Sequence, residues 1–232
     1  MIELHQFTPA FGLMNASPFC MKVEVFLKLA GLEYRCVNGA MPMGKPKGKL
    51  PVLHDDAQVI ADSQAIVEHL QRRYADRLPP ALRAPMTGAH HALRRMLEES
   101  TYFCALWLRW IDDTGWVSTA PAFFGQLPWP AYPLVPALVR RKMRRDLIGQ
   151  GTGRHSRDEI CQRALADLSA LEAMLGEQPF FAGVEPGAID ATTYAFIANL
   201  LWAPIDNPVR AEGLKRPALV AYAERMQARV GR

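Results

Sequence analysis

The sequence has few cysteines and none of the short spacings that would pair them. Cys20, Cys36, Cys104 and Cys161 lie far apart, and no Cys-x-x-Cys occurs among the 232 residues. Small disulfide-stabilised domains and dithiol redox sites are therefore not expected. No secretory signal sequence is visible after Met1, so the pattern predicts reduced thiols and a cytoplasmic location.

Metal-binding motifs are also missing. The sequence contains no His-Glu-x-x-His and no paired cysteine spacing. His90 and His91 are adjacent, so on a helix their side chains would point about 100° apart and could not easily share an ion. The sequence predicts no metal site.

Strong charge is absent too, because the net charge is only +4. This balance is too mild to indicate a nucleic-acid partner. No charged residue occurs from Thr114 to Val139, a length that could span a bilayer. Each interior proline costs a helix roughly 3 kcal/mol, so we expect a proline-broken connection there and no membrane span. The prolines are Pro121, Pro128, Pro130, Pro133 and Pro136. The basic residues that follow, from Arg140 to Arg145, are either a solvated face or a site for an anionic partner.

Two stretches organise the chain: Ser17-Pro18-Phe19-Cys20 and Lys49-Leu50-Pro51-Val52. Ser17 suits the N-cap of a helix, where its hydroxyl accepts from an unpaired amide, and Pro18 suits the first helical position. Apolar residues then recur at helical spacing as far as Gly31, which predicts the end of the helix. Free amides and the helix dipole at such an N-terminus favour a thiolate.

Strands are expected at Ile2 to Phe7 and at Tyr34 to Val37, on either side of this helix. A hairpin is expected around residues 52–61, followed by a helix that begins at Asp62 or Ser63. Prolines at positions 79, 80 and 85 mark a linker, and helical periodicity dominates beyond it. We therefore expect a sheet-containing domain over residues 1–78 and an all-helical domain over residues 87–232.

The amino-acid sequence of these stretches resembles that of a known superfamily. Ser17 to Cys20 lies where thioredoxin-like proteins keep a Cys-x-x-Cys, a single Cys or a Ser. Lys49 to Leu53, followed by Ile60 to Ile66, resembles the glutathione-binding half of glutathione transferases, and is most similar to the failed-axon-connections and metaxin-like branch. The resemblance implies an α+β thioredoxin-like N-terminal domain followed by an all-α helical C-terminal domain. Relatives carry a Ser or Thr cap three residues before a buried aspartate, where this chain has Gly187 and Asp190.

The resemblance also implies a serine-type glutathione site. Ser17 would donate a hydrogen bond to the glutathione thiolate as the catalytic residue. Leu50 would pair with the cysteinyl backbone of glutathione ahead of a cis Pro51, and Asp62 and Ser63 would hold the γ-glutamyl carboxylate. The implied glutathione contacts are Phe19, Leu50, Pro51, Asp62 and Ser63.

Each of these residues also has a purely structural interpretation. Ser17 and Asp62 can cap helices, and Pro51 can be an ordinary strand-edge proline. Cys20 can be a buried small hydrophobe, or it can occupy the place of the second cysteine of redox relatives. The lysines at positions 45, 47 and 49 either reach the glycyl carboxylate of glutathione or lie in solvent.

A hydrophobic electrophile would lie between the two domains, by the same resemblance. Relatives line that pocket with the first long helix, which here carries Tyr102, Phe103, Trp107 and Trp110. Most aromatic residues at such spacing belong to a core, so one or two of the four are expected to face the pocket. The resemblance further implies a homodimer packed through the third and fourth helices. The expected function is conjugation of glutathione to the electrophile, and the alternative is a non-enzymatic metaxin-like scaffold or membrane-complex subunit.

Overall fold

The N-terminal part of the chain folds around a mixed four-stranded sheet in the computed structural model, which describes residues 1–231. The strands are β1 (Ile2–His5), β2 (Tyr34–Val37), β3 (Val52–Asp55) and β4 (Gln58–Ala61), in the order β2-β1-β3-β4. β1 pairs with β2 in parallel, and the pairs β1–β3 and β3–β4 are antiparallel. The helices α1 (Pro18–Ala30) and α2 (Ser63–Arg73) complete a βαβ unit followed by a ββα unit. The predicted thioredoxin-like fold is confirmed.

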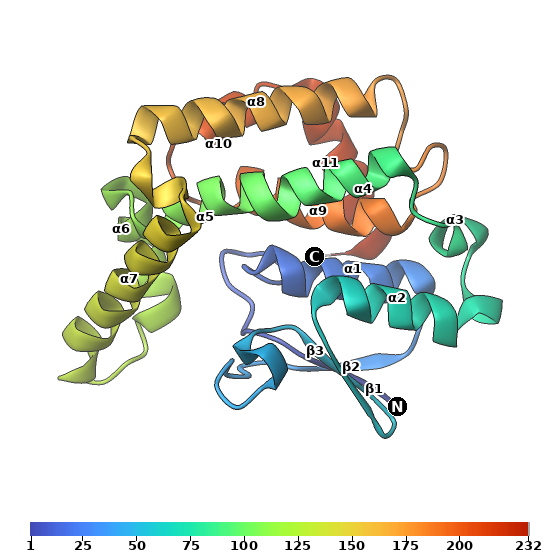
Figure 1. Ribbon diagram of the computed structural model, residues 1–232, viewed down its shortest axis with the longest axis horizontal. Coiled ribbons are helices and arrows are strands. Elements are labelled where there is room, and N and C mark those ends of the chain that lie inside the picture. The colour runs from blue at the N-terminus through green and yellow to red at the C-terminus, as the bar shows by residue number, and fades with distance from the viewer. Residues whose placement is uncertain (232) are drawn as a thin grey trace.

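Helices make up the rest of the described chain (Figure 1). After the 3₁₀ turn η2 (Ala75–Arg77), the predicted linker contains a short helix, α3 (Pro80–Arg83). The predicted long helix is then continuous but not uniform, because a π-helical turn, η3 (Leu97–Thr101), joins α4 (Gly88–Met96) to α5 (Tyr102–Trp110). The remaining long helices are α6 (Asp113–Phe124), α7 (Ala131–Gln150), α8 (Arg157–Leu175), α9 (Ala188–Leu201) and α11 (Pro217–Val230). The short elements are η1 (Pro46–Gly48), η4 (Thr152–Arg154) and α10 (Pro208–Gly213).

One hydrophobic core joins the sheet to the helices. Figure 1 shows α1 and α2 between the sheet and the remaining helices, and α1 packs directly against α9. The side chains of Phe26 in α1, Leu53 in β3 and Ile197 in α9 belong to the same buried cluster. The site residues near α1 are therefore held by contacts from both parts of the molecule.

Asp190 stabilises the start of α9 although its cap residue is a glycine. The Asp190 carboxylate accepts hydrogen bonds from the backbone amides of Gly187, Phe181 and Ala182 at 2.8–3.1 Å. The Tyr222 hydroxyl lies 3.1 Å from the same carboxylate. The aspartate half of the relatives' capping box is therefore kept, although Gly187 supplies no side-chain cap.

The segment from Thr114 to Val139 is broken between α6 and α7, where Pro128 and Pro130 lie, as the prolines predicted, but the rest of it is helical. It contains most of α6 and the first half of α7, with Pro121 and Pro136 inside these helices. A proline inside a helix leaves the carbonyl four residues earlier without its donor. That carbonyl belongs to Val117 for Pro121, and Val117 is 74% exposed, so solvent can satisfy it. Among the described residues, no helix is long and apolar enough to cross a membrane.

The basic stretch after this segment is partly structural. The Arg140 guanidinium donates to the carbonyls of Trp110 and Ile111 and lies over the Trp116 ring, 4.9 Å from its centroid. It also pairs with the Asp113 carboxylate at 2.6 Å. Arg140 therefore fastens α7 to α5 and α6, while Arg141 and Arg145 are exposed.

Candidate active site

Ser17 caps α1 as predicted. Its hydroxyl accepts a hydrogen bond from the Cys20 amide at 3.4 Å, and Pro18 is the first helical residue. Gly31 ends the helix in a left-handed conformation with a φ of 62°. The Ser17 side chain is only half-buried. The Ser17 oxygen accepts from the helix, and its proton can be donated to a second partner, either the Cys20 sulfur or a ligand.

A buried polar network holds the backbone on either side of Ser17. The Ser17 amide donates to Asn15 Oδ1 at 3.0 Å, and the Arg109 guanidinium donates to the Ala16 carbonyl at 2.6 Å. Asn199 of α9 accepts from Arg109 at 3.2 Å and donates to the Asn15 carbonyl at 3.2 Å. Burial lowers the pKa of Arg109 to about 10, so the guanidinium stays charged at neutral pH. The position of Ser17 is thus set by α5 and α9 as well as by its own helix.

Cys20 behaves as a small hydrophobic residue. It is fully buried, and it packs with Leu50 and Val52 in a small apolar cluster. Burial raises the pKa of the Cys20 thiol to about 11, although hydrogen bonds from Ser17 and Phe7 oppose the shift. The thiol is therefore protonated at neutral pH and is not a nucleophile.

The Leu50–Pro51 peptide bond lies beside the N-terminus of α1. It is cis, as the resemblance predicted, and Leu50 and Pro51 are both buried. The apolar cluster of Cys20, Leu50 and Val52 joins this peptide to the first turn of α1. Two of the three predicted motifs thus meet at one end of this helix.

Asp62 and Ser63 form the third motif, at the start of α2. Asp62 Oδ1 accepts hydrogen bonds from the amides of Gln64 at 3.0 Å and Ala65 at 3.2 Å. The backbone of Asp62 has a φ of 90°, which an aspartate rarely adopts, and such strained positions are common at ligand clamps. Ser63 is buried and Asp62 is exposed.

Lys22 connects this motif to α1 and to the helical part of the chain. Its ammonium lies 2.8 Å from Gln64 Oε1 and 2.8 Å from Glu98 Oε1. Arg94 pairs with the other Glu98 oxygen at 2.6 Å. The buried Lys22 ammonium therefore joins α1 to the first turn of α2 and to the turn η3.

The structure places the four predicted pocket aromatics in different surroundings along α5. The Tyr102 ring lies edge-on to those of Phe19 at 4.8 Å and Phe103 at 5.1 Å, so two predicted pocket residues meet one predicted glutathione contact. Trp110 lies further along α5 and packs against Trp116 at 6.0 Å, together with Phe123 and Phe124. Trp107 is partly buried against the main core.

A cavity of about 450 Å³ lies elsewhere. It is lined by residues of the loop before α1 and of α9 and α11, among them Phe11, Met14, Tyr194 and Gln227. None of the four predicted pocket aromatics lines it. The place of the electrophile therefore stays a prediction.

Sequence reasoning missed Lys22, Glu98 and Arg109. A signal was present for Arg109, because it is the single charge in the apolar run Tyr102–Trp110. Lys22 was less distinct, because its helix also carries Glu24 and Lys28. A buried charge needs a partner, so such a residue marks a place where another element must come close.

Two family models match this chain. The model of the glutathione S-transferase N-terminal domain covers residues 18–115, and the model of the glutathione S-transferase C-terminal domain covers residues 164–226. The chain belongs to the glutathione transferase superfamily.

Relatives of this superfamily member fall into two kinds. An isoprene-epoxide–glutathione S-transferase of Rhodococcus sp. (strain AD45) is 29% identical, with 98% of each chain covered. The protein Failed axon connections of Drosophila melanogaster is 31% identical over 98% of this chain and 57% of its own length. Metaxin-2 of Homo sapiens is 24% identical over 93% of this chain and 82% of its own length. The superfamily resemblance and the failed-axon-connections and metaxin-like branch are thus both confirmed.

Solved structures support the same fold. A glutathione S-transferase of Ceriporiopsis subvermispora in complex with glutathione superimposes with a TM-score of 0.61 at 20% identity. The match covers 99% of this chain and 98% of that one. At this identity the likeness establishes the glutathione transferase fold and no more.

Proposed function

We propose that this chain binds glutathione as a co-substrate and stabilises its thiolate with Ser17. The observation that carries the proposal is the convergence of Ser17, the cis Leu50–Pro51 peptide and the Asp62–Ser63 pair around the first turns of α1 and α2. Glutathione would pair with the Leu50 backbone through its cysteinyl unit. The ammonium of its γ-glutamyl unit would reach the Asp62 carboxylate, and the carboxylate of the same unit would reach Ser63 at the N-terminus of α2.

The proposed reaction is conjugation of glutathione to a hydrophobic electrophile. The Ser17 hydroxyl and the N-terminus of α1 would lower the pKa of the glutathione thiol, which releases its proton to solvent. The thiolate would then form a bond from sulfur to carbon, and the electron pair of the broken bond would leave with the displaced atom. Phe19, Tyr102 and Phe103 offer an apolar wall beside Ser17.

A second candidate function is that of a non-enzymatic scaffold or membrane-complex subunit. Metaxin-2 and Failed axon connections are among the relatives. One structural feature favours this candidate, namely the large apolar side chains exposed on α6 and α7 and between them. Val117, Trp129, Leu134 and Leu138 are 56–84% exposed, and exposed apolar patches mark interaction surfaces.

Calorimetric titration with glutathione distinguishes the two candidates. We expect binding in the micromolar-to-millimolar range, and a strong loss in the double variant Asp62→Ala with Ser63→Ala. Each lost charge-assisted hydrogen bond costs about 1.5–3 kcal/mol. If neither heat nor a thermal shift appears with millimolar glutathione, the scaffold candidate takes the place of the transferase.

Controls separate binding from helix capping. Asp62→Ala also removes the cap of α2, so the melting temperature of each variant is measured without ligand. Asp62→Asn keeps a capping oxygen and removes the charge, and it should still weaken binding. Asp158→Ala removes an exposed carboxylate from the first turn of α8 and should leave binding unchanged.

We also propose that the protein is a cytoplasmic homodimer. All four cysteines are free thiols, which agrees with a reducing compartment. Light scattering at micromolar concentration should report twice the chain mass of 25.9 kDa. A particle of 25.9 kDa would refute the dimer.

A further inference from the structure

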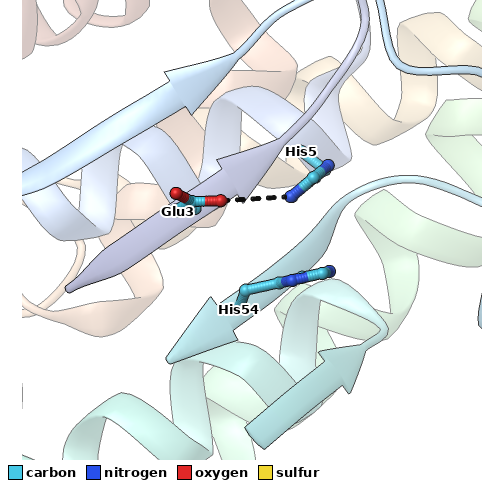
Figure 2. A group of neighbouring side chains, drawn as sticks. All are labelled: Glu3, His5 and His54. Carbon is cyan, nitrogen blue, oxygen red and sulfur yellow. Dashed lines mark ion pairs between the residues drawn. The ribbon is translucent and has the colours of Figure 1, made fainter. Parts of the chain in front are cut away.

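Three metal-ligating side chains meet on the sheet, outside the candidate active site. Glu3 and His5 are two residues apart on β1, so they point to the same face, while Ile2 and Leu4 point into the core. His54 lies directly opposite Glu3 on β3. Figure 2 shows the three side chains gathered over this strand pair.

The three groups are close enough for one ion to bridge them. Glu3 Oε2 lies 3.7 Å from His5 Nε2, and one ligand atom from each residue lies within 4.8 Å of the others. The rings of His5 and His54 are stacked, with centroids 4.2 Å apart. A tetrahedral zinc site with bonds of about 2.0–2.1 Å places its ligand atoms about 3.3 Å apart. The ligand atoms, which lie within 4.8 Å of one another, would have to close to that spacing, and the His54 ring would have to turn out of the stack so that both ring planes contain the ion.

His5 Nε2 forms no hydrogen bond within the described residues. The atom is also buried. Buried polar atoms without partners are rare, and an ion or a water usually accounts for them. This nitrogen faces the Glu3 carboxylate at 3.7 Å, which is beyond hydrogen-bond distance (Figure 2).

The carboxylate is prepared for ligation. Arg35 pairs with Glu3 Oε1. Oε2 then remains for an ion, and Arg35 holds the carboxylate in place as an outer partner.

The Lys45 ammonium would compete with a metal ion for the His5 ring. The ammonium lies 3.2 Å from His5 Nδ1, and an ammonium can only donate, so the Nδ1 lone pair is the acceptor. In the neutral ring the proton then sits on Nε2. An ion on Nε2 therefore requires that proton to move to Nδ1 and Lys45 to swing away on its loop. Ion binding and the Lys45 contact exclude each other.

We propose that Glu3, His5 and His54 bind one divalent transition-metal ion of the zinc class, in competition with Lys45. Two imidazoles and a carboxylate suit Zn²⁺ and its neighbours and do not suit Mg²⁺. A water would complete the coordination, because the strands supply three ligands. The site is independent of glutathione binding, so its test does not depend on the proposed function.

The experiment is equilibrium titration of the untagged full-length chain with Zn²⁺ and, separately, with Mg²⁺. We expect one Zn²⁺ per chain, no binding of Mg²⁺, and a loss of at least about tenfold in Zn²⁺ affinity for His5→Gln, His54→Gln and Glu3→Gln. Lys45→Ala removes the competitor and should raise the affinity. His91→Gln removes an exposed imidazole from α4 and is the matched control.

Thermal unfolding of each variant without metal shows that the variants are folded before they are titrated. His54→Gln is the decisive variant, because replacing Glu3 would also break its pair with Arg35 and replacing His5 would break its contact with Lys45. The proposal is overturned if millimolar Zn²⁺ does not bind. It is also overturned if binding survives His54→Gln unchanged, or if His91→Gln weakens binding as much.

Discussion

The Lys22 ammonium lies 2.8 Å from the Glu98 carboxylate, across the contact between α1 and the π-helical turn η3. The two side chains are 1% and 8% exposed, so water screens their interaction little. Arg94 pairs with the second Glu98 oxygen. One buried carboxylate therefore pairs with two cations, and it joins the helix of Ser17 to the helical part of the molecule.

Glu98→Gln should strongly destabilise the protein. The substitution keeps the shape and one acceptor oxygen, but it leaves Lys22 and Arg94 without their counter-charge. Removing one partner of a buried ion pair costs about 3–5 kcal/mol. Urea unfolding measures the change. Glu99→Gln is the matched control, because its ion pair with Arg95 is 51% exposed on both sides and should contribute less than about 1 kcal/mol. Equal effects of the two substitutions would contradict the role given to Glu98.

Arg109→Met should both destabilise the protein and disturb Ser17. It leaves the Ala16 carbonyl and Asn199 Oδ1 without a donor. Each buried acceptor that loses its hydrogen bond lowers the free energy of unfolding by about 1–3 kcal/mol. Because Ala16 precedes Ser17, the affinity for glutathione should fall as well. Arg145→Met is the control, since that side chain is 79% exposed on α7. Unchanged glutathione affinity in folded Arg109→Met would show that the network does not position the site.

Local signals in the sequence were enough for the elements around the site. Ser17, Pro18 and Gly31 predicted the start and end of α1 because capping depends on neighbouring residues alone. The strand from Tyr34 to Val37 was placed at its observed bounds. The cis state of Pro51 came only from the resemblance, because a proline in a sequence does not reveal its isomer.

The sequence did not predict which residues far apart in the chain pair with one another. Nothing near Lys22 indicates that its partner is 76 residues away, and the same holds for Arg109 and Ala16 at 93 residues. The sequence patterns of known metal sites do not reveal the cluster of Glu3, His5 and His54, because two of these residues lie on β1 and the third lies on β3. A Glu-x-His pair on a strand shares one face, but only the register of β1 and β3 brings His54 to it.

Cys20 should resist alkylation until the pH is far above neutral. Burial raises the pKa of its thiol from about 9.0 to about 11, so the folded state holds the proton more tightly than the unfolded state. This group therefore contributes stability that is fully present below about pH 9 and is lost as the pH rises toward 11. Iodoacetamide labelling followed by peptide mass spectrometry, at increasing pH, reports the titration.

The Cys20→Ala variant tests the predicted effect of this thiol on the pH dependence of stability. The variant should lose stability less steeply than the wild type between pH 9 and 11. Cys36, Cys104 and Cys161 also have raised thiol pKa values and remain as internal references. Rapid labelling of Cys20 at pH 7 in the folded protein would show that its thiol is a nucleophile after all.

The thiol pKa of bound glutathione distinguishes a role of Ser17 in stabilising the thiolate from a role of Cys20. A free thiol has a pKa near about 8.5, and lowering it by about two units requires about 2.7 kcal/mol of thiolate stabilisation. A hydroxyl that donates to a charged sulfur supplies about 1.5–3 kcal/mol, and the helix terminus adds about 0.3–1 kcal/mol. Ser17→Ala should therefore raise the pKa of bound glutathione by about one unit or more, with a smaller effect on its affinity.

Ultraviolet absorbance of the bound thiolate against pH measures this shift, with three further variants. Cys20→Ala should leave the titration unchanged. Thr87→Ala removes the cap of α4, where Thr87 Oγ1 accepts from the His90 amide at 3.1 Å, and it controls for the loss of a cap. Ser17→Cys should form a mixed disulfide when supplied with oxidised glutathione, because a thiol then occupies the position of the hydroxyl. If Cys20→Ala shifts the titration and Ser17→Ala does not, the thiolate is stabilised at Cys20 and the assignment to Ser17 is wrong.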